Sequence, residues 1–138
     1  LQKAHDLWTA LGCHVTHMSP ESHDAAFAAV SHLPHMLAFS LMNSIGAQAQ
    51  ADHFLALGGP GFRDFTRIAA SEPKVWRDIF LANRTELLAQ SALFRQALEQ
   101  LEKALKNGTT QALEDQLTLA SETRTHWRMG AARNKNSH

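Results

Sequence analysis

The chain has 138 residues, of which 44% are hydrophobic and 19% charged, so it can bury the core of one ordinary domain and is not globally disordered. Thirteen lysines and arginines balance thirteen aspartates and glutamates, which excludes the basic surface typical of proteins that bind nucleic acid or anionic membranes. No uninterrupted apolar run reaches the roughly 18 residues of a membrane span, and the single Cys13 cannot form an internal disulfide, as expected of a cytoplasmic protein.

The first 18 residues resemble the end of an α/β domain. Residues 2–11 predict a helix that stops at Gly12, and residues 13–18 are the one plausible strand. One helix and one strand are not stable alone, because the strand has no partner. Since the chain also begins with Leu1 rather than Met, we expect residues 1–18 to be the remnant of a preceding domain in a longer protein.

The remainder has the composition of a helical protein, rich in Ala, Leu, Gln, Glu and Arg and without Tyr. Ser19-Pro20-Glu21 predicts a helix start, and apolar residues three and four apart continue this helix to about residue 50. Pro34 lacks an N–H and should kink it. Gly58-Gly59-Pro60-Gly61 predicts an interruption of helical structure, after which a short helix is expected over residues 62–70.

A second long helix is expected over residues 73–107, where an apolar seam runs until Asn107-Gly108. Its length of about 50 Å exceeds what one bundle of this size can cover, which favours a homodimer over a helix packed wholly within its own bundle. Asn83 lies on the seam, where a buried side-chain amide needs a hydrogen-bond partner, and it could fix the register between paired helices. Thr109 or Thr110 should begin a last helix. We therefore expect a helical domain over residues 19–130 and a frayed tail over residues 131–138.

Histidines gather around the predicted kink, in His23-Asp24 and Ser31-His32-Leu33-Pro34-His35. On a helix, His32 and His35 lie nearly one above the other, beside carbonyls freed by Pro34. Such a pair is suited to contact a ligand, and the alternative is two buried histidines bonded to carbonyls or to Asp24. No metal site is predicted, since neither a Cys pair nor an HExxH motif accompanies them.

Arginines follow the glycine-rich turn, with Arg63 and Arg67 four residues apart on one helix face. Arg63 falls in the first turn of the predicted helix, where a cation opposes the helix dipole. Because an arginine can bind a carboxylate through two hydrogen bonds, the pattern indicates a small acidic ligand. The alternative is that both arginines form surface ion pairs with Asp64, Glu72 or Asp78.

Taken in order, these segments resemble the C-terminal half of the prephenate dehydrogenases. The motifs that carry the resemblance are His23-Asp24, Ser31-His32-Leu33-Pro34-His35, Gly61-Phe62-Arg63-Asp64-Phe65-Thr66-Arg67-Ile68-Ala69, and Trp76-Arg77-Asp78-Ile79 with Asn83. The resemblance implies an all-α dimerisation domain, similar to the C-terminal domain of 6-phosphogluconate dehydrogenase, beside a nucleotide-binding Rossmann domain of which residues 1–18 would be a remnant. Enzymes of the family use NAD or NADP to convert prephenate into 4-hydroxyphenylpyruvate and carbon dioxide for tyrosine biosynthesis.

The resemblance also implies roles for single residues. Ser31, His32 and His35 would line the prephenate pocket, and Arg67 would bind a substrate carboxylate. Arg63 and Asp64 would border the pocket mouth, where the family often responds to tyrosine as an inhibitor.

The family's dinucleotide-binding GxGxxG fingerprint and its catalytic histidine belong to the N-terminal domain, and this sequence contains neither. We therefore expect no catalytic residue in this chain, NAD or NADP to be bound mainly by the N-terminal domain, and the chain to be inactive alone. Arogenate dehydrogenase is an alternative within the family. Another is a non-enzymatic helical dimer that binds a metal or haem through its histidine cluster.

Overall fold

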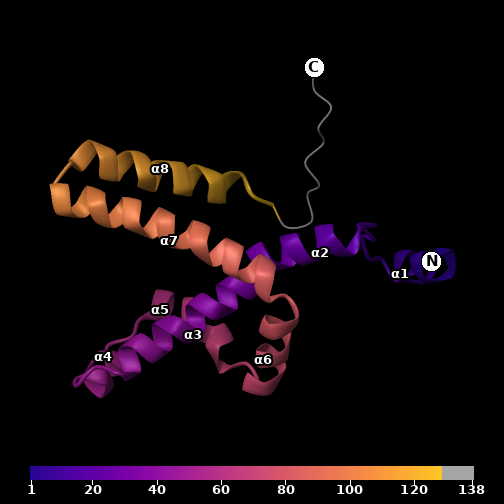
Figure 1. Ribbon diagram of the computed structural model, residues 1–138, viewed down its shortest axis with the longest axis horizontal. Helices are drawn as coiled ribbons and strands as arrows, with labels where there is room; N and C mark the ends of the chain where they lie inside the picture. The colour runs from indigo at the N-terminus through magenta and orange to yellow at the C-terminus, as the bar shows by residue number, and fades with distance from the viewer. Residues whose placement is uncertain (129–138) are drawn as a thin grey trace. The chain divides into compact units, whose positions relative to one another are not determined.

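The computed structural model describes residues 1–128, which form helices and contain no strand (Figure 1). The expectation of an all-α fold is therefore confirmed for this part of the chain, whereas the predicted frayed tail at residues 131–138 lies outside the described residues. The chain forms two compact units. One comprises Met18–Arg95, and the other joins Leu1–His17 to the segment that begins at Gln96.

The unit Met18–Arg95 begins with α2 (Pro20–Phe27), continues through a π-helical turn, η1 (Ala28–His32), and enters α3 (Leu33–Gly46). The predicted start is confirmed, because the Ser19 hydroxyl accepts a hydrogen bond from the Ser22 N–H at 3.1 Å. The irregularity expected at Pro34 takes the form of this π turn, in which the Leu33 N–H bonds to the Ala28 carbonyl. A widened turn suits a position followed by a residue that cannot donate.

Three shorter elements follow: α4 (Ala51–Ala56), α5 (Pro60–Thr66) and the 3₁₀ turn η2 (Arg67–Ala70). The sequence did not indicate α4, and it placed the next helix two residues late. Gly59 is extended and Pro60 occupies the first helical position, where its missing N–H costs nothing. Both α5 and η2 pack against α3, so the arginines and the histidines belong to the same unit.

The predicted single helix over residues 73–107 is wrong. Asn83, at φ −112° and ψ 32°, separates α6 (Pro73–Ala82) from α7 (Arg84–Asn107). The Asn83 carbonyl accepts from the Leu87 N–H at 3.1 Å and so starts α7, while its side chain donates to the Asp24 carbonyl. Asn83 thus keeps its helical backbone hydrogen bonds while its φ and ψ angles depart from the helix and its side chain bonds to a distant carbonyl. The length of one continuous helix therefore no longer supports the dimer.

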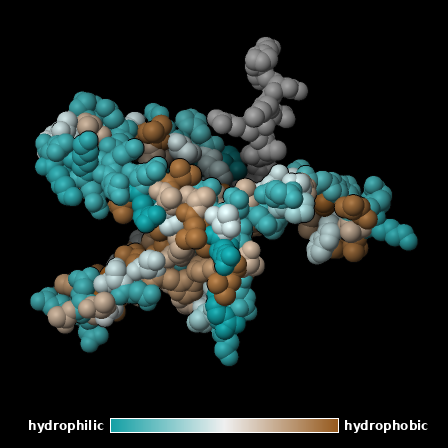
Figure 2. Space-filling model, viewed as in Figure 1, coloured by the Kyte–Doolittle hydropathy of each residue, from teal (hydrophilic) through white to brown (hydrophobic). Residues whose placement is uncertain are grey.

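Little apolar surface is buried inside the unit Met18–Arg95, where Ala28, Ala38 and Leu87 are the buried hydrophobic residues. An aromatic cluster joins α6 to α3: Phe80 contacts the edges of Phe39 and Trp76, with ring centroids 6.4 and 5.6 Å apart. Large apolar side chains stay at the surface, and Figure 2 shows hydrophobic residues exposed on the face it draws. Such exposure is typical of a chain that packs against a partner.

The other unit contains α1 (Gln2–Ala10), the last turns of α7 and α8 (Thr110–His126). The first predicted helix is confirmed, and Gly12 follows it with a positive φ of 81°. The strand expected over residues 13–18 is wrong: residues 13–19 have no regular secondary structure, since the described chain offers no strand to pair with. Gly108, at φ 63°, ends α7, and Thr109 is the N-cap residue of α8 as expected.

The helical stretch Pro20–Gly46 is long and apolar enough, by length and composition alone, to cross a membrane. Core helices of globular proteins, which are mostly buried, pass the same test, whereas 11% of the apolar window is buried here. Here the stretch is interrupted by the π turn and carries three histidines, and α5, η2 and α6 pack against it. These features are those of a helix that faces other protein segments.

Candidate functional site

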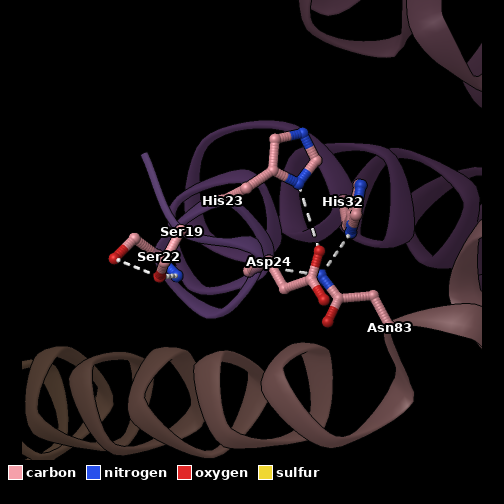
Figure 3. Close-up of polar contacts among 6 residues, drawn as sticks. All are labelled: Ser19, Ser22, His23, Asp24, His32 and Asn83. Carbon is pink, nitrogen blue, oxygen red and sulfur yellow. Dashed lines mark hydrogen bonds and ion pairs between the residues drawn. The ribbon is translucent and has the colours of Figure 1, made fainter. Parts of the chain in front are cut away.

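The centre of the candidate site is a contact between two irregular points of the backbone, the π turn and the break at Asn83 (Figure 3). The Asn83 Nδ2 atom lies 2.8 Å from the Asp24 carbonyl oxygen and 3.2 Å from Nδ1 of His32. The first contact is a hydrogen bond across 59 residues of sequence. Asn83 therefore finds its partners within the chain, and the expectation that it could set the register between paired helices is not needed to explain it.

His35 is held from two sides. Its Nδ1 atom lies 2.9 Å from the Ser31 carbonyl, which only accepts, so this nitrogen donates. Its ring stacks on Trp76 of α6, with centroids 3.4 Å apart and planes inclined by 17°. His32 meets the edge of the same indole at 6.3 Å. The predicted pair is thus brought together by Trp76 and half-buried. The carbonyl bond foreseen as the alternative is present at His35, whereas the hydrogen-bond partner of His32 is the Asn83 amide.

His32 lies in an environment that favours its neutral form. Burial lowers the pKa of His32 below its usual value of 6.5, and the neighbouring His23 and His35 lower it further. The carboxylate of Asp24 opposes this effect. Asp24 is itself shared with the exposed His23, whose Nδ1 lies 3.1 Å from its Oδ1. The combination favours an uncharged imidazole that binds by hydrogen bonding.

The two arginines differ. Arg63 forms an ion pair with Asp64, with Nε and Oδ1 3.1 Å apart, and both side chains are largely exposed, as in the ion-pair alternative. Arg67 begins η2, is exposed, and has no hydrogen bond or ion pair to another side chain within residues 1–128. Asp78 pairs with Arg77 instead, at 2.8 Å. Arg67 is thus the arginine of the two whose charge remains available to a ligand.

Two further features complete the site. A shallow hollow of about 250 Å³ adjoins Asn83, and its lining residues are Glu21, Asp24, Ala82, Asn83, Thr85 and Glu86. Among residues 1–128, no three His, Cys, Asp or Glu side chains converge to hold a metal ion. Sequence reasoning missed Trp76 as a site residue. An aromatic residue at helical spacing is more often part of a core, and only the packing of α6 reveals the stack with His35.

Comparison with known proteins identifies the family. The family model described as "Prephenate dehydrogenase, dimerization domain" matches residues 19–119. The cyclohexadienyl dehydrogenase of Zymomonas mobilis is 36% identical over 102 residues, which cover 72% of this chain and 35% of that protein. The prephenate dehydrogenase of Bacillus subtilis is 36% identical over 89 residues, 64% of this chain and 24% of that protein. The chain therefore spans about a third or less of these relatives' lengths.

Solved structures agree in fold. Prephenate dehydrogenase from A. aeolicus, in complex with hydroxyphenyl propionate and NAD⁺, superposes with a TM-score of 0.82 at 36% identity, covering 90% of this chain and 44% of that one. Arogenate dehydrogenase from Synechocystis gives a TM-score of 0.80 at 26% identity, covering 90% of this chain and 46% of that one. The chain belongs to the prephenate dehydrogenase family and carries its dimerization domain.

Proposed function

We propose that this chain is the substrate-binding and dimerisation part of a cytoplasmic, NAD- or NADP-dependent prephenate dehydrogenase. The complete enzyme would convert prephenate into 4-hydroxyphenylpyruvate and carbon dioxide in tyrosine biosynthesis. The observation that carries this proposal is the half-buried pair His32 and His35, held against Trp76 in a chain of this family. Hydrogen-bonding groups beside an aromatic ring suit a cyclic substrate that carries polar groups.

The arginines support an anionic substrate. Prephenate carries two carboxylates, and a free guanidinium at Arg67 can bind one of them through two parallel hydrogen bonds. η2, which begins at Arg67, packs on α3, whose first turn contains His35. The ligand named for the A. aeolicus structure, hydroxyphenyl propionate, also combines a ring with a carboxylate. Arg63 and Asp64 would lie at the pocket mouth, where tyrosine would act as an inhibitor.

The described residues supply binding and orientation rather than the redox step. A bound nicotinamide would accept the hydride while the substrate ring loses carbon dioxide and becomes aromatic. His32 and His35 would hold the substrate ring with Ser31 close by, and Arg67 would fix one carboxylate. Their task is to keep the reacting ring in one orientation, which is a large part of catalysis by positioning.

Exposed apolar side chains support the homodimer. Along α7, a single continuous helix, Leu88, Leu93, Phe94, Leu98 and Leu105 are between 36% and 65% exposed. A second subunit that covers these residues would remove apolar area from water, which stabilises association. The description of the matching family as a dimerization domain agrees with this proposal.

Arogenate is the alternative substrate, favoured by the structural likeness to the Synechocystis arogenate dehydrogenase. Arogenate carries an amino group where prephenate carries a keto group. The test is to assay the complete protein with each compound and with NAD⁺ and NADP⁺, following the reduced nicotinamide by its absorbance. Turnover of prephenate supports the proposal. Turnover of arogenate alone supports the alternative, and activity with neither contradicts both.

A further inference from the structure

The orientation of the Asn83 amide can be deduced from its surroundings. The Asp24 carbonyl oxygen, 2.8 Å from the Asn83 side chain, can only accept a hydrogen bond. The atom that faces it must therefore be the amide nitrogen, because the amide oxygen would place two acceptors in contact. The same nitrogen lies 3.2 Å from Nδ1 of His32, and an NH₂ group has two hydrogens to donate.

This geometry decides the proton position on His32. Nδ1 of His32 faces a donor, so it must hold a lone pair. In the neutral ring the proton then resides on Nε2. A doubly protonated ring would turn an N–H toward the Asn83 NH₂ and lose this bond. Burial of His32, which lowers its pKa, acts in the same direction.

His35 is held in the opposite form. Its Nδ1 faces the Ser31 carbonyl at 2.9 Å, so Nδ1 must carry the proton. In the neutral ring Nε2 therefore has the lone pair. The stack on Trp76 fixes the plane of this ring. Two histidines three residues apart thus differ at Nε2, where one donates and the other accepts.

We propose that Asn83 is a positioning residue that locks His32 in the Nε2–H tautomer, so that His32 acts as a hydrogen-bond donor to an oxygen of the ligand and not as a base. The assignment of the tautomer stands on the contacts of Asn83 alone. The role toward a ligand oxygen, a carboxylate or a carbonyl, rests on the proposed function. Asn83 itself need not touch the ligand.

The first test is nuclear magnetic resonance of the complete protein labelled with ¹⁵N at histidine, at a pH where His32 is neutral. The nitrogen shifts of His32 should show a bare Nδ1 and a protonated Nε2, and those of His35 should show the reverse. A His32 ring with its proton on Nδ1 would overturn the proposal. Because this measurement uses the wild-type protein, it does not depend on the folding of any variant.

The second test replaces the donor. In Asn83→Asp the new carboxylate only accepts, so His32 should move its proton to Nδ1 or become charged, and its titration midpoint should rise. The charged and titratable groups that also act on His32 are Asp24, His23 and His35, and none of them is substituted in this variant, although the Asp24 carbonyl loses its donor as well. Asn43→Asp is the matched control, since Asn43 lies exposed on α3 in the same unit. An unchanged His32 signal in folded Asn83→Asp would contradict the proposal.

Binding separates this inference from the proposed function. Loss of one hydrogen bond should weaken prephenate binding by Asn83→Asp between about twofold and about tenfold, and Asn43→Asp should bind like wild type. A changed tautomer with unchanged prephenate binding would overturn the donor role of His32 and leave its tautomer established. Wild-type protein that turns over neither prephenate nor arogenate would contradict the proposed function, whatever the tautomer.

Discussion

Replacement of Arg67 by alanine in the complete enzyme is the sharpest test of the anionic site. Arg67 is exposed and has no ion pair within residues 1–128, so a ligand carboxylate can bind it without breaking an existing contact. A hydrogen bond to a charged group contributes about 1.5–3 kcal/mol net. Each 1.4 kcal/mol of binding free energy changes the dissociation constant tenfold, so Arg67→Ala should weaken prephenate binding by roughly 10- to 150-fold.

The controls come from the neighbouring arginines. Arg77→Ala removes an exposed arginine that already pairs with Asp78 at 2.8 Å, and it should leave prephenate binding near the wild-type value. Arg63→Ala should have a smaller effect than Arg67→Ala, because Arg63 is paired with Asp64, and it should alter inhibition by tyrosine instead. Arg67→Lys should rescue binding only in part, since it keeps the charge but loses the planar guanidinium.

The assay is steady-state kinetics with prephenate varied at saturating nicotinamide, together with the cofactor affinity of each variant. The Michaelis constant for prephenate should rise in Arg67→Ala while the cofactor affinity stays the same. Equal Michaelis constants for prephenate in wild type and in a folded Arg67→Ala would refute the assignment. Arg67 would then be an ordinary surface arginine.

The remaining predictions concern the histidines and the helices. His35→Ala in the complete enzyme should raise the Michaelis constant for prephenate more than it lowers kcat, and a collapse of kcat alone would contradict a binding role. Folding lowers the pKa of His32, so the unfolded chain takes up its proton more readily. The stability contributed by neutral His32 is therefore complete above about pH 6.5, the pKa of the unfolded chain, and is lost as the pH falls from there through the lowered pKa of the folded protein. The melting temperature of His32→Gln should therefore depend less on pH than that of wild type, as measured between pH 5 and 8. Leu87→Ala should lower the free energy of unfolding by about 2–5 kcal/mol, because Leu87 is buried. Leu88→Glu, at a position that is 65% exposed, should instead weaken the dimer and lower the mass measured by light scattering. An unchanged mass would place the interface elsewhere.

The sequence predicted those features that depend on local chemistry. Ser19 and Pro20 begin a helix as expected, and Gly12 and Gly108 lie just past helix ends with positive φ. The spacing of His32 and His35 also predicted that the two would share one face. Each of these features is determined by residues close together in the sequence, so a short stretch of sequence is enough to predict it.

The features that the sequence missed depend on contacts between distant segments. The apolar seam runs on through Asn83 from Phe80 to Leu87, so periodicity alone predicted one helix. The hydrogen bond from Asn83 to the Asp24 carbonyl, 59 residues away, is invisible to any local pattern. Trp76 was missed for the same reason, because an aromatic residue at helical spacing is interpreted as a core residue unless its contact with His35 is known.

The two departures from regular helix are parts of one arrangement. The π turn Ala28–His32 carries His32 at its end, and the break at Asn83 supplies the amide that faces this ring. The backbone of Asn83 keeps both of its helical hydrogen bonds, to the Ile79 carbonyl and from the Leu87 N–H, so the break lies in its φ and ψ angles, which differ from those of a helix. A regular helix before Pro34 would turn the histidines by a different angle. π turns and sparsely populated backbone angles are common at functional sites, where local stability is given up for geometry. That both irregularities meet at one imidazole is the strongest physical reason to place the substrate beside His32 and not at the exposed His23.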